Sequence, residues 1–258
     1  MKLLALGLIP GARERNTGLW NYLFYIVVLL TLTGSVKNWI QHFQNQHYID
    51  QVAQLVMQQA QPKDTRARIL ALQHYLQTHV TYLGAPHDDR PFFRASAAET
   101  LQSGRGYCGE VSRTFIKLAH AVGIRAQRIN LYGSSTHVVA EAELNETDRV
   151  IVDCQAPPQI KELEPLETVM LRHEYDDYST LNLRRLHLNW IFRRIKLEMG
   201  SLNYWLESPY ALKALAWLAL ASALVSLRFF ALTGRRLLRW ILTRRGWVHL
   251  SNLDFTTN

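Results

Sequence analysis

Two long apolar runs stand out from the pattern of hydrophobic and polar positions along the chain. The first covers residues 20–36 and the second residues 209–232, with no charge between Ala214 and Leu227. A helix needs roughly 17–25 mostly apolar residues to cross the hydrocarbon core of a bilayer. Both runs are therefore predicted to be membrane-spanning helices.

Between these runs the pattern predicts a domain of mixed helices and strands. Residues 64–80 and 108–122 carry apolar positions three and four apart, the period of an amphipathic helix. Three short runs follow at 126–132, 137–144 and 149–153, and their composition is typical of β-strands. The order of these elements predicts an α+β fold, in which a helix packs on an antiparallel sheet.

Three further segments carry weaker signals. Residues 50–61 are predicted to form a helix that Pro62 ends, and residues 84–94 have the composition of a loop. Residues 180–199 fit a helix that carries Trp190 among several arginines. Such a helix suits a membrane surface, but it equally suits a solvated face of the domain.

Charge is distributed unevenly along the 258 residues. The chain carries 29 Lys and Arg against 21 Asp and Glu, which gives a formal net charge of +8. Residues 36–205 are nearly neutral, with 19 basic and 18 acidic residues, so the excess flanks the apolar runs. This placement indicates a membrane protein and argues against nucleic acid as a partner. The two cysteines exclude a disulfide-rich scaffold.

The flanking arginines predict an orientation. Because basic residues gather on the cytoplasmic side of a membrane, both ends are expected to be cytoplasmic. We predict a multi-pass protein of the inner (plasma) membrane, in contact with membrane lipids. Its expected parts are a cytoplasmic tail (1–18), a transmembrane helix (19–36), an extracytoplasmic domain (37–205), a second transmembrane helix (209–232) and a basic cytoplasmic tail (233–258).

Three alternatives to this arrangement stay open. The first run fits a signal sequence, with small residues at 33–35 near its end. The second run fits a buried core helix, although its length and flanking arginines favour a span. The basic residues Arg193, Arg194 and Lys196 lie on the domain side of the second run and would suit a domain that faces the cytoplasm.

The chemistry centres on Cys108, which opens a predicted helix after a glycine-rich approach. Gly104 and Gly106 let the backbone turn tightly, and the helix dipole favours a thiolate at this end. The backbone N–H of Cys108 would face a developing oxyanion, and the side-chain amide of Gln102 is a second candidate donor. Gly106 and Gln102 are therefore predicted to position the oxyanion.

A base and an orienting carboxylate are expected on the strands that follow. If His137 lies opposite Asp153, then Val139 faces Ile151 and Glu141 faces Arg149, which gives complementary pairs on one face. This register leaves a three-residue turn at 144–146. Asp153 would then fix the tautomer of His137 and stabilise its imidazolium.

Several motifs in this order resemble the transglutaminase-like superfamily, which has the papain-like cysteine enzyme fold. They are GYCGEVSRTF at 106–115, GIRA at 123–126, HVVAE at 137–141 and VIVD at 150–153, and the helix ending in HVTY at 79–82 resembles the leading helix of the family. The resemblance covers roughly residues 64–155. Family members often have an aromatic residue soon after the histidine, whereas Val138 and Val139 stand there in this chain.

The resemblance implies a thiolate at Cys108, a base at His137 and an orienting carboxylate at Asp153, without a cofactor. It does not choose a reaction, because the superfamily includes transamidases, peptidases, amidases and inactive members. No acidic cluster resembles the calcium sites of animal transglutaminases. Cys154 follows Asp153 and should point to the opposite sheet face, as a core residue. A disulfide between Cys108 and Cys154, or a zinc site formed with His137 and Asp153, is less favoured because strand parity and ligand spacing oppose them.

We therefore predict a membrane-anchored cysteine enzyme that attacks an amide or ester carbonyl of a peptide, protein or other substrate. The alternative is a catalytically silent module that binds a partner protein within a membrane complex. Hydrolysis and transamidation differ only in the nucleophile that reaches the thioester second, so the choice between them stays open.

Overall fold

The computed structural model describes residues 12–84, 94–183 and 186–245. The chain divides into two compact units. One is the domain Asn38–Leu212, and the other joins the N-terminal residues up to Lys37 with those from Lys213 onward. Each unit is described by itself.

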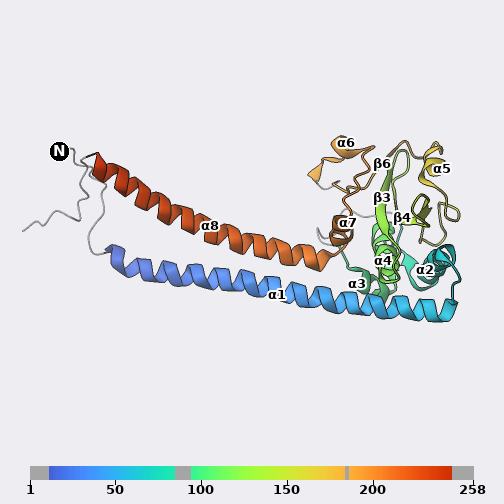
Figure 1. Ribbon diagram of the computed structural model, residues 1–258, viewed down its shortest axis with the longest axis horizontal. Helices are drawn as coiled ribbons and strands as arrows, with labels where there is room; N and C mark the ends of the chain where they lie inside the picture. Colours follow the sequence, from blue (N-terminus) through green and yellow to red (C-terminus); the bar gives the residue numbers. More distant parts are fainter. Residues whose placement is uncertain (1–11, 85–93, 184–185, 246–258) are drawn as a thin grey trace, which may run out of the picture. The chain divides into compact units, whose positions relative to one another are not determined.

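The second unit is built from two long helices, α1 (Ala12–Ala60) and α8 (Pro209–Arg244), apart from the ends that belong to the domain (Figure 1). Both helices are long and apolar enough to cross a membrane, as judged by length and composition. Large apolar side chains such as Leu29 and Phe230 are exposed along them. The second apolar run is therefore not a core helix of this structure.

Close contacts join the two helices of this unit. Gly34 lies against Trp217, and a Cβ atom at Gly34 would come within 3.2 Å of the indole ring. The hydroxyl of Ser35 donates a hydrogen bond to the Ala214 carbonyl at 2.9 Å. Small residues at such contacts allow helices to approach closely, as in membrane helix pairs.

The α1 helix corrects one prediction. The sequence predicts a separate helix over 50–61, but α1 continues without a break to Ala60. No glycine or proline interrupts the chain between Gly34 and Pro62, so nothing stops the helix earlier. The expected stop before Pro62 is present.

The domain has the expected α+β architecture. Its main sheet has four antiparallel strands in the order β5-β4-β3-β6, and a two-stranded parallel sheet joins β1 and β2. Its elements are α2 (Thr65–His79), β1 (Thr81–Tyr82), α3 (Ala97–Ser103), β2 (Arg105–Gly106), α4 (Cys108–Ala121), β3 (Ala126–Tyr132), β4 (His137–Glu143), β5 (Arg149–Val152), α5 (Leu166–Met170), β6 (Asp177–Ser179), α6 (Asn189–Phe192) and α7 (Ser201–Leu206).

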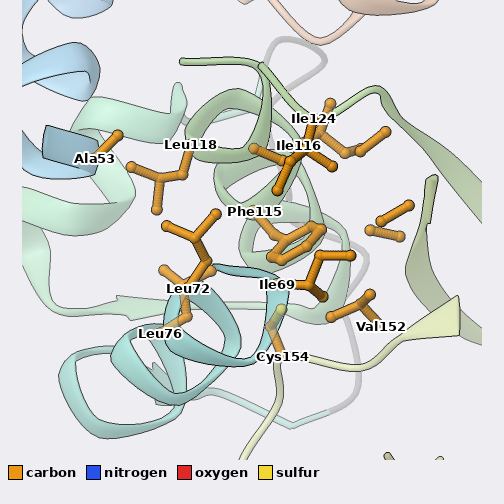
Figure 2. Close-up of a cluster of buried hydrophobic side chains, with 14 of the residues drawn as sticks. Ala53, Ile69, Leu72, Leu76, Phe115, Ile116, Leu118, Ile124, Val152 and Cys154 are labelled. Carbon is orange, nitrogen blue, oxygen red and sulfur yellow. The ribbon is translucent and has the colours of Figure 1, made fainter. Parts of the chain in front are cut away.

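The main core lies around α4, whose apolar stripe packs between α2 and the sheet (Figure 2). Asp64 caps α2, because its carboxylate accepts a hydrogen bond from the Ala67 N–H at 2.7 Å. Phe115 is fully buried and lies close to Ile69 in Figure 2. Cys154 is buried in the same cluster, as its strand parity predicts. This packing holds α4 between α2 and the sheet.

The hairpin of β4 and β5 has a register that differs from the predicted one by two residues. Glu141 pairs with Ile151 and Glu143 with Arg149, so the turn is 145–147 and not 144–146. The side chain of Asn145 explains this turn, because its oxygen accepts hydrogen bonds from the N–H groups of Thr147 and Asp148. A shift of two residues keeps every side chain on its predicted face.

The predicted helix over 180–199 is wrong. Among the described residues of this segment, the only α-helix is the short α6, and the chain around it forms turns and irregular structure, with positive φ at His187 and Arg194. Ile195 forms a bridge with Ser179, and Arg194 forms an ion pair with Asp177. These contacts with β6 compete with helix formation. The predicted loop at 84–94 falls mostly on residues 85–93, which lie outside the described part of the chain.

Candidate active site

Cys108 is the first residue of α4, and the preceding residues place it there. Gly104 ends α3 in the left-handed conformation, with φ 62°, and so turns the chain toward β2. Gly106 packs closely, since a Cβ atom there would lie 3.0 Å from the Thr100 methyl group. The N–H of Cys108 therefore belongs to the first helical turn, where amide groups have no acceptor within the helix.

His137 and Asp153 meet on one face of the hairpin. The distance from His137 Nε2 to Asp153 Oδ2 is 3.0 Å. In the observed register the two residues are diagonal neighbours, and side chains at such positions remain within reach of each other. Both are almost completely buried.

A set of hydrogen bonds fixes the Asp153 side chain. The backbone N–H groups of Gln159 and Ile160 donate to Oδ2, and that of Gln155 donates to Oδ1. The Gln73 side chain on α2 donates to the Asp153 carbonyl at 2.8 Å. The carboxylate is thus oriented before any substrate binds, and none of these partners was predicted from the sequence.

The Cys108 thiol and the His137 imidazole each stabilise the charged form of the other, the imidazolium and the thiolate. Burial alone would raise the pKa of Cys108, but a hydrogen bond to His137, the charge of that imidazole, a backbone hydrogen bond from Val138 and the charge of Arg128 lower it. Burial alone would lower the pKa of His137, but hydrogen bonds to Asp153 and Cys108 raise the pKa to about 9. This arrangement favours a thiolate beside an imidazolium at neutral pH.

Ser112 ties the two elements of this pair together. Its hydroxyl lies 2.7 Å from the Cys108 carbonyl and 2.8 Å from the Val138 carbonyl. It therefore links the first turn of α4 to the strand that carries His137. A serine four residues after the cysteine was a signal available in the sequence, but a serine in a helix has many other roles.

A buried ionic cluster lies behind the first turn of α4. Glu207 accepts hydrogen bonds from Arg128 on β3 and from Arg113 on α4. Burial alone would raise the pKa of Glu207, but the two guanidinium groups hold the pKa at about 2. Glu207 is therefore a buried carboxylate that stays charged. No sequence pattern pointed to it, because it lies 79 residues from Arg128.

Gln102 is placed differently from the other candidate residues. It lies on α3 with an exposed side chain, and no hydrogen bond recorded among the described residues joins it to Cys108. Its expected role at the oxyanion stays a prediction. The structure thus brings Cys108, His137 and Asp153 together, with Gly106 two residues before the thiol.

Comparison with known proteins gives one family match. Residues 50–154 match the family model of the transglutaminase-like superfamily. The matched segment holds Cys108, His137 and Asp153, so the similarity to this superfamily covers the residues of the candidate site. No curated protein sequence matches the chain significantly.

Three solved structures are also similar to parts of the chain. A provisionally assigned cysteine protease from Cytophaga hutchinsonii is 18% identical, with a TM-score of 0.37, over 46% of this chain and 41% of that one. A structure described as a TGase is 13% identical over 50% of this chain and 36% of its own, with a TM-score of 0.39. A provisionally assigned protease from Parabacteroides distasonis is 12% identical over 52% of this chain and 31% of its own, with a TM-score of 0.30. The similarity thus spans less than half of each of these three proteins.

Proposed function

We propose that this protein is a membrane-anchored cysteine acyl-transfer enzyme that acts on an amide or ester carbonyl. Cys108 is the nucleophile, His137 the acid and base, and Asp153 the group that orients His137. The observation that carries the proposal is the imidazole of His137, which hydrogen bonds to a fixed, buried carboxylate and to the thiol at a helix start. A thiol beside an imidazole that is held in this way meets the requirements of an activated nucleophile.

The reaction proceeds in two steps, acylation of the thiol and deacylation of the thioester. The Cys108 thiolate attacks the carbonyl carbon, a C–S bond forms, and the negative oxygen faces the N–H of Cys108. The imidazolium of His137 gives its proton to the departing amine or alkoxide as the bond to carbon breaks. Water or an amine then loses a proton to His137, attacks the thioester and releases the thiolate. Hydrolysis and transamidation share every step except the identity of this second nucleophile.

Acylation of the thiol tests the proposal. The full-length protein in detergent is incubated with an activated acetate ester, and intact mass followed by peptide mapping locates the acetyl group. We expect one acetyl group on Cys108 in the wild type and none in Cys108→Ala. The matched control Cys154→Ala should still be acetylated on Cys108, because Cys154 is buried in the core. Acetylation that survives Cys108→Ala, or no acetylation of a folded protein, would contradict the assignment.

One observation favours a second function. Cys108 is only 8% exposed and His137 only 2%, so a substrate carbonyl reaches the sulfur only after neighbouring groups move. In this alternative the domain is catalytically silent and holds a partner protein within a membrane assembly. A folded domain whose thiol resists the activated ester would support the silent module.

The membrane arrangement is part of the proposal. Two apolar helices are present, and arginines follow the second from Arg235 onward. We therefore place both ends in the cytoplasm and the domain outside it. A reporter enzyme that is active only outside the cytoplasm should be active when fused after Gln61 and inactive when fused after Asn258. The reverse result would place the domain in the cytoplasm. Equal reporter activity at both fusion sites would mean that the chain does not cross the membrane between them.

A further inference from the structure

Arg128 occupies an unusual position for a charged residue. It lies on β3 between Ala126 and Asn130, on the face that packs against α4, and it is only 8% exposed. Its Nε and Nη2 atoms donate to the two oxygens of Glu207, both at 2.6 Å. A guanidinium held by two bonds to one carboxylate has a fixed direction.

The same guanidinium reaches the residue after the nucleophile. Arg128 Nη2 donates a hydrogen bond to the Gly109 carbonyl at 2.8 Å. Gly109 leaves the necessary space, because a Cβ atom there would lie 2.9 Å from Arg128 Nη1. The Gly109 carbonyl and the Arg128 side chain therefore fit together only because residue 109 is glycine.

Arg113 provides an internal comparison. It lies on α4, is as deeply buried as Arg128 and donates to the same Glu207 oxygen at 3.1 Å. Its remaining hydrogen bond goes to the Ala95 carbonyl at 2.6 Å, away from the first turn of α4. Two buried arginines thus share one carboxylate, but of these two side chains only that of Arg128 contacts the first turn of α4, which Arg94 also approaches at Gly109.

We propose that Arg128 is a positioning residue, which fixes the first turn of α4 and places a second positive charge, besides that of His137, near the Cys108 sulfur, while Glu207 holds Arg128 in place. The inference rests on the proposed function of Cys108. Glu207 lies two residues before Pro209, where α8 begins. The segment that leads into the second apolar helix is therefore part of the active-site architecture, although the family match ends at residue 154.

The charges of Arg128 and Glu207 predict opposite shifts of the pH midpoint of Cys108 alkylation, which a purely structural role does not. Loss of the Arg128 charge should disfavour the thiolate and move the pH midpoint of Cys108 alkylation upward. Glu207→Gln keeps one side-chain oxygen that accepts from Arg128 but removes the negative charge, so the arginines are less neutralised and the midpoint should move downward. A residue that merely holds the helix together would give the same upward shift in both variants.

The experiment measures the alkylation rate of Cys108 by a haloacetamide between pH 4 and pH 10 (a span of about 6 units, which brackets ordinary thiols). The full-length wild type is compared with Arg128→Gln, Glu207→Gln and the matched control Arg113→Gln, and mass spectrometry assigns the adduct. We expect Arg128→Gln to react roughly tenfold more slowly below its midpoint, as for loss of a neighbouring opposite charge. Arg113→Gln should lower the melting temperature but leave the midpoint unchanged.

The possible outcomes separate this inference from the proposed function. A reactive wild-type thiol with an unchanged midpoint in Arg128→Gln overturns the inference alone, and so does a common upward shift in all three variants. A wild-type Cys108 that is inert across the whole pH range overturns the proposed function as well. Should Arg128→Gln fail to fold, Glu207→Gln decides by itself, because an unchanged or raised midpoint contradicts the role of the charge.

Discussion

His137→Ala should slow the alkylation of Cys108 at neutral pH by about a hundredfold, the lower range of what a positioned acid or base contributes. The reason is electrostatic. The pKa of His137 is raised to about 9, so the imidazole stays protonated at neutral pH and stabilises the thiolate. Without it, burial dominates and the thiol keeps its proton. The measurement is the rate of adduct formation on Cys108 in the full-length protein.

His120→Ala is the matched control for this experiment. His120 lies on the same helix as Cys108, near its other end, where its ring packs against Tyr204. We expect His120→Ala to leave the alkylation rate of Cys108 within about twofold of wild type, because a single substitution far from the site usually has a small effect. Asp153→Asn should be milder than His137→Ala, because an amide still orients the imidazole. Equal rates for His137→Ala and wild type would remove His137 from the mechanism.

Phe115→Ala should destabilise the domain by about 3–5 kcal/mol, the range for deletion of a buried aromatic ring. Phe115 is fully buried at the centre of the α4 stripe, and Figure 2 shows it beside Ile69 and above Cys154. The cavity left behind cannot close easily, because α2 and the sheet hold the helix from both sides. This loss approaches the lower end of the stability of an ordinary domain, about 5–15 kcal/mol.

Cys154 offers a readout of this core. Its thiol is 3% exposed, so alkylation of Cys154 reports opening of the core as urea is added. We expect the midpoint to move to much lower urea in Phe115→Ala. Leu171→Ala serves as the control, because Leu171 is 87% exposed and its loss should change the free energy of unfolding by less than about 0.5 kcal/mol. Equal midpoints in the two variants would contradict the described core.

The elements that sequence patterns predicted best are the helices with an apolar stripe and the short runs of β-type composition. The stripes of α2 and α4 and the strands β3, β4 and β5 all appear in the structure. The hairpin register was wrong because registers that differ by two residues place the same side chains on the same faces. Only the local chemistry of Asn145 separates them, and that side chain selects the turn at 145–147.

The parts that could not be predicted depend on contacts between distant residues. Glu207 meets Arg128 across 79 positions, and Gln73 meets Asp153 across 80. No periodicity connects such pairs. One signal was available: an arginine at 128 on the inward face of a strand requires a buried anionic or carbonyl partner. The segment after Ser179 was mispredicted for the same reason, since its pairing with β6 outweighs its helix-like composition.

The pH dependence of Cys108 alkylation in the unmodified full-length protein tests most directly whether a thiolate–imidazolium pair exists at this site. An ordinary cysteine thiol has a pKa of about 8.5. We predict that the rate reaches half of its plateau clearly below that value, and that it stays on this plateau as the pH rises further, because the thiolate is already formed. A rate that rises only above the ordinary thiol pKa, as for an isolated buried cysteine, would contradict the pair and with it the proposed enzyme.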